Sequence, residues 1–284
     1  RMTLSRFARM CEAIELRDSP IDKIRIIDES LSSFSNPKIV LDILTLNLDV
    51  NSIGNKRAIT WIANALELFD EEVKAEEETW GDIGEGMYQF LHTDNKSNLS
   101  IKQLSALLQL DCASINSNSY VIFAEAIKQM SDIETKWFLR YWLRTPRNRV
   151  SYSTVVKAVN RRFPNSNVKS LSNIQHVSTV FSYLDKGKQP PTSIQTGMFL
   201  APSLAKSYSN NLPKNYILDV KYDGNRYQVV MFNASTCILD TEIYPVINNN
   251  SIDPAPHKKM NVRVHAKDKQ EAMLKCPVKM VIFD

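Results

Sequence analysis

Residues 221–226 (KYDGNR) are the best candidates for chemistry in this sequence. They follow an apolar run, 216–220, that predicts a β-strand, and the Asp-Gly pair among them predicts the turn that ends it. Strand alternation places Asp219 and Lys221 on the same face. A lysine at a strand end, with its pKa depressed by cationic neighbours, can act as an amine nucleophile, and Arg226 can contact a phosphate or sugar just beyond it. The alternative is a surface strand that ends in a turn, with Asp219 and Lys221 joined in a salt bridge.

A second candidate site is a basic segment, residues 135–184, that contains no acidic residue. Its basic residues are Lys136, Arg140, Arg144, Arg147, Arg149, Lys157, Arg161, Arg162 and Lys169. An opposing acidic cluster precedes it between residues 70 and 82. A basic block inside a patterned, folded segment suggests a polyanion such as nucleic acid as the partner. The alternative is a solvated face, or one that the acidic cluster neutralises within the same domain.

The spacing of the basic residues suggests how such a surface is built. Lys136, Arg140 and Arg144 recur at i, i+4 and i+8, so we expect them to line one helix face while neighbouring aromatic residues pack. Beyond a turn at Pro146, two serines stand at the start of the next helix, where free backbone amides and hydroxyls suit a phosphate. The predicted DNA-binding residues are Lys136, Arg140, Arg144, Arg147, Ser151 and Ser153. Contacts of this kind set position on a duplex and do not read its sequence.

Helices are expected to carry this surface, because residues 1 to about 195 show helical periodicity. Phe7, Met10, Cys11 and Ile14 follow the i, i+3, i+4, i+7 rule. Residues 59–69 form another such run, and the Ser-x-x-Gln sequence at 100–103 predicts a capping box. Residues 124–144 predict one or two further helices. The sequence therefore predicts an all-α domain over residues 1–195.

The pattern changes after residues 186–191, a linker-like stretch with two adjacent prolines. Short apolar or alternating runs follow at 216–220, 227–232, 237–244 and 278–283, and these predict strands. We therefore expect a second domain of α+β class over residues 196–284.

Composition excludes several classes of protein. A length of 284 residues suggests two domains, and 43% hydrophobic and 23% charged residues are ordinary for a globular chain. No apolar run approaches the roughly 18–20 residues of a membrane span, and no signal-peptide pattern is present, so we expect no membrane partner. The 4 cysteines lack C-x-x-C spacing, which argues against a zinc site or a disulfide framework and favours an intracellular location.

Several segments together resemble ATP-dependent DNA ligases. The KYDGNR segment resembles their nucleotidyl-transfer motif, which RNA ligases and mRNA capping enzymes share. In the second domain, residues 202–205 (PSLA), 239–242 (LDTE) and 281–284 (VIFD) resemble further ligase motifs. In the helical region, residues 80–85 (WGDIGE) resemble the G-D-x-G element of ligase DNA-binding domains, and residues 137–155 resemble their strongest segment. The order of these segments is the ligase order.

The resemblance implies a helical DNA-binding domain followed by part of an adenylation (nucleotidyltransferase) domain. Lys221 would attack the α-phosphate of ATP, release pyrophosphate and hold AMP as a phosphoramidate. Asp219 would accept a hydrogen bond from the adenine amino group, and Val220 would contribute backbone contacts to the base. The AMP would then move to the 5′-phosphate of a nick, where the 3′-hydroxyl displaces it and seals the strand.

The resemblance also assigns residues around the nucleotide. Arg226 would contact the AMP ribose or the DNA 5′-phosphate, Glu242 would lie near the ribose and the metal, and Phe283 would stack on adenine. The metal would be Mg²⁺, which neutralises the triphosphate as phosphoryl transfer requires. The implied partner is nicked duplex DNA in replication, repair or recombination. We expect a monomer, located in the nucleus if the source is eukaryotic, with scaffold proteins bound through regions outside this chain.

The chain also departs from the ligase pattern. Only the thirteen residues 227–239 separate Arg226 from Asp240, whereas ligases carry a far longer stretch there with another arginine. The later lysine motifs and the OB-fold domain do not follow Asp284, and Arg149 stands where relatives usually have a glycine. We therefore expect a truncated or gapped ligase that is poorly active or inactive. A non-catalytic DNA-binding ligase fragment is one alternative, and an RNA ligase or capping enzyme is another.

Overall fold

The computed structural model describes residues 3–49, 53–93, 97–112, 114–192, 225–232, 236–245 and 277–283. The chain divides into two compact units, Arg1–Thr192 and Ser193–Asp284, which are described separately. No helix among the described residues is long and apolar enough to cross a membrane.

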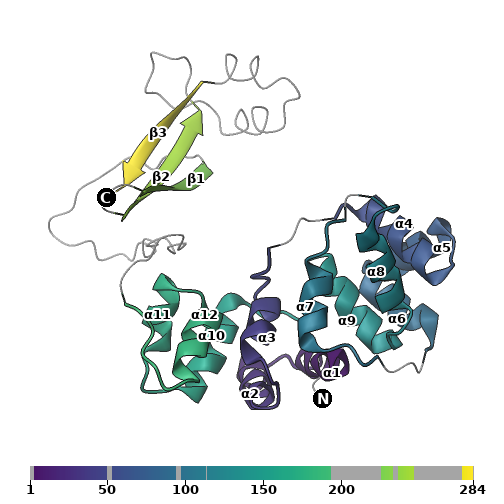
Figure 1. The fold of residues 1–284 in the computed structure, drawn as a ribbon, viewed down its shortest axis with the longest axis horizontal. Coiled ribbons are helices and arrows are strands. Elements are labelled where there is room, and N and C mark those ends of the chain that lie inside the picture. Colours follow the sequence, from purple (N-terminus) through teal and green to yellow (C-terminus); the bar gives the residue numbers. More distant parts are fainter. Residues whose placement is uncertain are drawn as a thin grey trace, which may run out of the picture. The chain divides into compact units, whose positions relative to one another are not determined.

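The described part of the first unit is entirely helical apart from an isolated bridge between Thr3 and Ser100, as the sequence predicts (Figure 1). Its helices are α1 (Leu4–Glu15), α2 (Pro20–Leu31), α3 (Pro37–Leu44), α4 (Asn55–Leu66), α5 (Asp70–Trp80), α6 (Ile83–Leu91), α7 (Ile101–Leu108), α8 (Asn118–Ile127), α9 (Asp132–Trp142), α10 (Tyr152–Arg162), α11 (Val168–Ile174) and α12 (Val177–Leu184).

Local capping signals explain where several of these helices begin. The Ser100 hydroxyl accepts from the Gln103 backbone N–H, and the Gln103 side chain accepts from the Ser100 N–H, so the predicted capping box is confirmed at the start of α7. Ser131 and Glu134 form the same box at the start of α9. Two orphan backbone donors are satisfied in each case, which stabilises the first turn.

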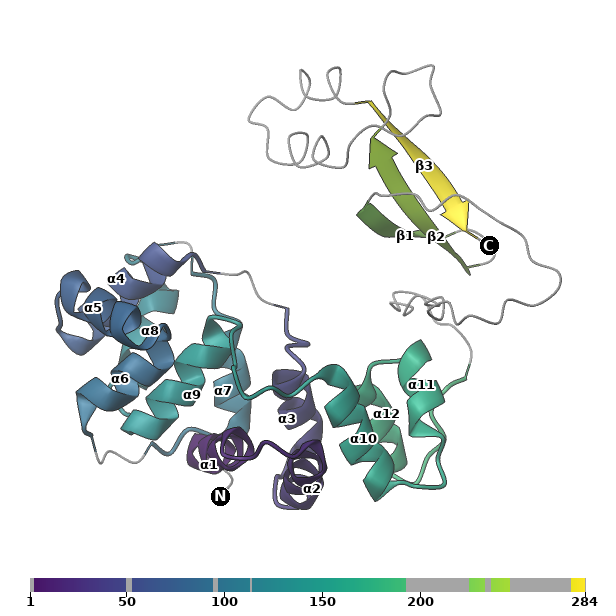
Figure 2. The same ribbon diagram turned by 180° about the vertical axis from the view of Figure 1, so that it is seen from behind.

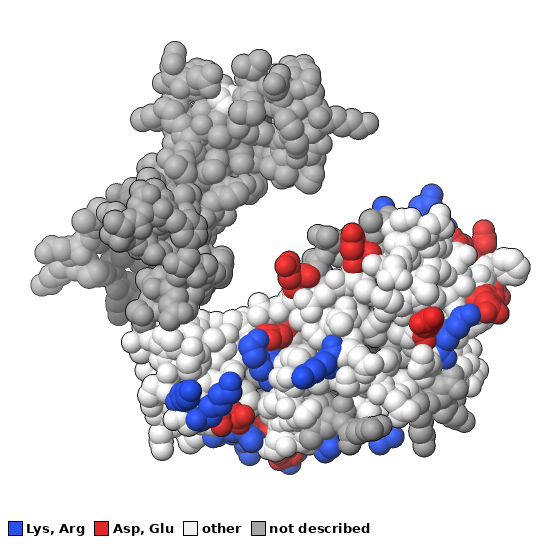
Figure 3. Space-filling view, in the orientation of Figure 1, with Lys and Arg blue, Asp and Glu red and all other residues white. Residues whose placement is uncertain are grey.

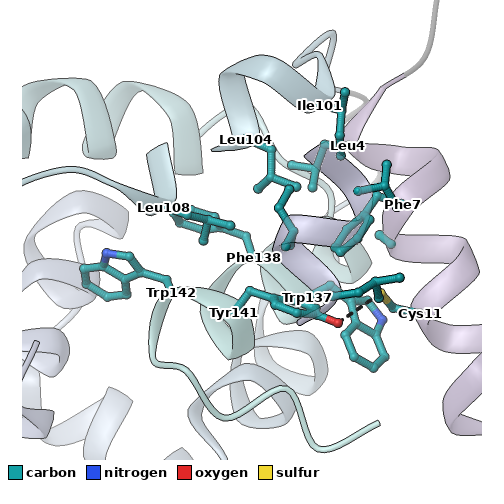
Figure 4. Close-up of a cluster of buried hydrophobic side chains, with 14 of the residues drawn as sticks. Leu4, Phe7, Cys11, Ile101, Leu104, Leu108, Trp137, Phe138, Tyr141 and Trp142 are labelled. Carbon is teal, nitrogen blue, oxygen red and sulfur yellow. Dashed lines mark hydrogen bonds between the residues drawn. The ribbon is translucent and has the colours of Figure 1, made fainter. Parts of the chain in front are cut away.

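Helix α9 is the central helix of one group of helices. It packs against α1, α6 and α7, and every residue from Glu134 to Trp142 is buried. Trp137, Phe138 and Tyr141 of α9 meet Phe7 of α1 in the hydrophobic cluster drawn in Figure 4, where the Cys11 thiol donates a hydrogen bond to the Tyr141 hydroxyl. A helix buried on all sides has no free face for a large ligand.

A second group of helices within the same unit combines segments that are far apart in sequence. Helix α10 packs on α2, and α12 packs on α3, while α10, α11 and α12 contact one another (Figure 2). The N-terminal helices α2 and α3 therefore hold the C-terminal helices of this unit in place.

The described part of the second unit is an antiparallel sheet of order β1-β2-β3, made of β1 (Asn225–Phe232), β2 (Thr236–Pro245) and β3 (Val278–Phe283). All three strands lie where the alternating pattern predicts them. The predicted strand at 216–220 lies outside the described residues.

Candidate nucleic-acid interface

Two of the basic residues predicted to contact DNA are buried inside the helical unit. The exposed fractions of Lys136 and Arg140 are 3% and 4%. The Lys136 ammonium lies 2.9–3.1 Å from carboxylate oxygens of Glu12, Glu15 and Glu85. We call these residues, with Asp82, the buried charge network.

Arg140 completes this network with three carboxylates. Its guanidinium lies 2.7 Å from Glu15, 2.8 Å from Asp82 and 3.2 Å from Glu85. The guanidinium carbon also lies 4.8 Å from the centre of the Trp137 ring, a cation–π arrangement. Two cations and four carboxylates, from α1, α6, α9 and the residue before α6, are thus brought together.

The network keeps both basic groups charged. Burial alone would lower the pKa of Lys136, but hydrogen bonds to Glu15, Glu85 and Glu12 outweigh it, so that pKa is raised. Burial would also lower the pKa of Arg140. The negative charge and hydrogen bond of Asp82, followed by those of Glu15, outweigh burial, so this pKa is raised. Burial would raise the pKa of Glu85, yet hydrogen bonds from Gln89 and Lys136 lower it. Each charge is compensated within the protein.

The G-D-x-G element, residues 81–84, lets α6 pack closely against α9, which brings the charges of the buried charge network together. Gly81 ends α5 with a φ of 64°, a left-handed conformation that favours glycine. One oxygen of Asp82 caps α6 by accepting from the Gly84 and Glu85 N–H groups, and the other accepts from Arg140. A Cβ at Gly84 would lie 2.7 Å from the Lys136 carbonyl oxygen. The motif therefore joins α5, α6 and α9.

The prediction that Lys136, Arg140 and Arg144 form one DNA-facing row is wrong in this structure. Lys136 and Arg140 point into the network because the neutralising carboxylates come from other helices. Arg144 is not on α9, which ends at Trp142; it has a φ of 58° and donates to the Leu46 carbonyl at 3.2 Å. The alternative of internal neutralisation holds for these two residues, although Asp82 alone of the acidic cluster takes part.

The turn between α9 and α10 carries three arginines with left-handed backbone conformations. The φ angles of Arg144, Arg147 and Arg149 are 58°, 54° and 55°. We call residues 144–149 the arginine turn. Arg147 is half exposed, donates to the Gly81 carbonyl at 2.6 Å and lies 3.6 Å from Asp82, whereas Arg149 is exposed. Two of these arginines are therefore fastened to other parts of the unit.

Buried hydrogen bonds hold the arginine turn from within. Asn148 is 1% exposed and donates through its side-chain amide to the Tyr141 hydroxyl at 2.9 Å. The buried Lys23 ammonium donates to the Asn148 carbonyl at 3.0 Å, and the Asn148 side-chain oxygen accepts from the Val150 N–H. The turn is thus anchored to α2 and α9, so its arginines are displayed on a fixed backbone.

An exposed row begins where the turn meets α10. Ser151 caps the helix by accepting from the Thr154 N–H, so both Ser151 and Ser153 lie at the start of a helix, as predicted, and both are exposed. Lys157 and Arg161 continue at i+4 and i+8 from Ser153 and are exposed as well. We call Ser153, Lys157 and Arg161 the α10 row. The i, i+4, i+8 spacing of these three residues is the sequence signal for this row, and the same spacing in α9 belongs to a buried face.

Basic and acidic side chains lie on different parts of the surface of the helical unit. Basic side chains gather over the part of the helical unit that contains α2 and α10, and acidic ones gather toward α4 and α5 (Figure 3). Arg161 lies 3.1 Å from Asp28 of α2, and Arg162 shares the same carboxylate at 3.7 Å. The arginine turn and the α10 row form the candidate nucleic-acid interface.

The candidate nucleotide residues are only partly within the described chain. Lys221, Asp219 and Val220 lie outside the described residues. Arg226 of β1 pairs in register with Glu242 of β2, and Phe283 of β3 pairs with Asp240. Among the described residues, no group of three or more His, Cys, Asp and Glu side chains could hold a metal ion.

Comparisons with known proteins give one clear result. Residues 3–160, over half of the chain, match the family described as DNA ligase N terminus. This span covers α1 to α9, the arginine turn and most of α10. No curated protein matches the chain.

Proposed function

Because the chain belongs to the DNA ligase N-terminal family, we propose that it is part of an ATP-dependent DNA ligase that seals nicks in duplex DNA during replication or repair. The observation that carries this proposal is the family match over residues 3–160. In this proposal the helical unit holds the duplex, and the second unit carries the nucleotide chemistry.

The exposed basic residues support duplex binding by the helical unit. Lys157 and Arg161 lie four residues apart on α10, and Arg147 lies in the turn that precedes it. Positive side chains at this spacing can contact phosphates along a duplex without reading bases. Such indifference to sequence suits an enzyme that must act at any nick.

The resemblance of residues 221–226 to a nucleotidyl-transfer motif supports the proposed chemistry. Lys221 would form the covalent bond to AMP, and Asp219 would accept from the adenine amino group. Arg226 and Glu242 are register partners on neighbouring strands, which suits a shared role near the ribose. The Glu242 carboxylate offers the oxygen donors that Mg²⁺ prefers, and the ion would neutralise the triphosphate.

Incubation with α-labelled ATP and Mg²⁺ tests the proposal. The chain should acquire label that survives denaturation, and Lys221→Ala should abolish it, because the lysine amine is the only group assigned to attack phosphorus. Asp219→Asn should weaken labelling and leave DNA binding intact. Label retained by Lys221→Ala would contradict the assignment. Duplex binding without any labelling of the parent chain would identify it as a non-catalytic DNA-binding ligase fragment.

A further inference from the structure

Arg149 occupies a backbone conformation that an arginine adopts at a cost. Its φ of 55° lies in the left-handed region, where glycine is free of the Cβ clash that every other L-residue experiences. Residues held in sparsely populated backbone regions cluster at functional sites, and the surrounding structure must compensate for them. A compensating role for the Arg149 side chain is therefore expected.

The neighbouring arginines have internal uses that account for them. Arg144 donates to the Leu46 carbonyl, which ties the turn to the residues after α3. Arg147 donates to the Gly81 carbonyl and faces Asp82 of the buried charge network. These contacts stabilise the arginine turn, so their side chains already serve the fold.

Arg149 has no comparable internal use. Its side chain is 82% exposed, and its ion-pair partner is Asp18 at 3.7 Å, a residue that is itself 101% exposed. Water and salt screen such a pair, which therefore contributes little to stability. No other hydrogen bond or ion pair of Arg149 occurs among the described residues. The fold does not recover the cost of placing an arginine here.

We propose that Arg149 is a DNA-phosphate contact of this chain, retained at a strained position for its charge. The inference rests on the proposed function and adds to it a specific residue outside the α10 row. The backbone on either side is fixed, because Asn148 is buried and bonded to Tyr141 and Lys23, and Ser151 caps α10. A planar guanidinium on a fixed backbone can bind a phosphate in bidentate geometry with little further loss of freedom.

Three substitutions separate the charge from the backbone strain. Arg149→Ala removes the charge and keeps the strain, Arg149→Gly removes both, and Arg149→Lys keeps the charge and the strain. Asp18→Asn is the control for the ion pair. Binding of the full chain to a fluorescein-labelled nicked duplex is measured by anisotropy at several salt concentrations, and thermal unfolding is followed by the helical circular dichroism signal.

We expect Arg149→Ala and Arg149→Gly to weaken binding by about tenfold and to flatten the dependence of log K on log salt by about 0.9, the slope of one phosphate contact. Arg149→Lys should retain that slope. Arg149→Gly should unfold at a higher temperature than Arg149→Ala, and Asp18→Asn should unfold at the parent temperature.

Three results would overturn the inference in distinguishable ways. If the parent chain binds the duplex and Arg149→Ala binds with the same affinity and salt slope, Arg149 is not a phosphate contact, and the proposed function stands. If the parent chain itself does not bind the duplex, both the proposed function and the role of Arg149 are wrong. A drop in unfolding temperature for Asp18→Asn that equals that of Arg149→Ala would assign the side chain to the ion pair.

Discussion

Replacement of Arg140 by methionine isolates the contribution of the buried charge network. The side chain is 4% exposed, and its guanidinium contacts Glu15, Asp82 and Glu85 at 2.7–3.2 Å. Methionine keeps the apolar stem against Trp137 and is flexible enough to fill the site. The perturbation therefore removes one buried charge with little loss of packing.

The structure sets the size of the effect. Without Arg140, the carboxylates of Glu12, Glu15 and Glu85 are left paired with Lys136. Asp82 is left with Arg147, at 3.6 Å. Breaking a buried ion pair by removing one partner costs about 3–5 kcal/mol. Glu15 and Glu85 are 27% and 21% exposed, so water can partly solvate them, and the lower end of this range applies. We expect a loss of about 3 kcal/mol, or roughly 6–12 °C in unfolding temperature for a unit of this size.

Thermal and urea unfolding of the full chain, followed by helical circular dichroism, measure this loss. Arg25→Met is the matched control, because its ion pair with Asp22 lies at 3.1 Å with side chains 49% and 39% exposed. That control should change stability by less than about 0.5 kcal/mol. A similar effect for the two variants would refute the view that the network stabilises the fold.

The pH dependence checks the same reasoning. The pKa of Glu85 is lowered in the folded chain, because hydrogen bonds from Gln89 and Lys136 and the charges of Lys136 and Arg140 outweigh its burial. A lowered folded-state pKa contributes stability that is full above the ordinary glutamate value and is lost as the pH falls through the folded-state value. Arg140→Met lacks part of this contribution. The stability difference between parent and variant should therefore shrink as the pH falls below the ordinary glutamate value, and a difference that grows on acidification would contradict it.

Two further predictions concern the motif and the interface. Gly84→Ala should lower the free energy of unfolding by about 1–3 kcal/mol, because the new Cβ would lie 2.7 Å from a backbone oxygen of α9. Gly81→Ala has open space around its Cβ, but the φ of 64° is unfavourable for alanine, so the cost in urea unfolding should be about 1–2 kcal/mol. Lys157→Glu should weaken binding to nicked duplex and flatten its salt dependence without changing the unfolding temperature. Lys102→Glu, at an exposed position of α7, is the control, and equal binding by the two variants would exclude the α10 row from the interface.

Local signals made the helices predictable. Each of these signals involves residues that are close together in the sequence, so it can be recognised there. They are the capping box of α7, the helical periodicity of α1 and the alternation of apolar residues in β1 to β3. The aromatic residues next to Lys136 and Arg140 were expected to pack, and the burial of Trp137 and Tyr141 confirms this. The end of α9 was not predictable in the same way, because no glycine marks it and Arg144 takes the left-handed conformation instead.

The environment of the α9 charges depends on tertiary structure and could not be read from their spacing. Glu12 and Glu15 are more than a hundred residues from Lys136 and Arg140, and Asp82 and Glu85 are about fifty away. An absence of acidic residues along one segment therefore says nothing about acidic residues that other helices bring to it. The spacing identified a real helix face, but that face is buried.

Asp82 connects the folding role of the basic segment with its candidate binding role. One of its oxygens caps α6, while the other accepts from Arg140 and lies 3.6 Å from Arg147 of the arginine turn. The Arg147 contact with the Gly81 carbonyl uses one of its five donors, so donors remain for a phosphate outside the unit. A phosphate that approaches Arg147 therefore meets a guanidinium whose position is already set by the network. The two buried cations of α9 stabilise the frame on which the exposed arginines are held, and in the proposed function they would contribute to DNA binding through that frame.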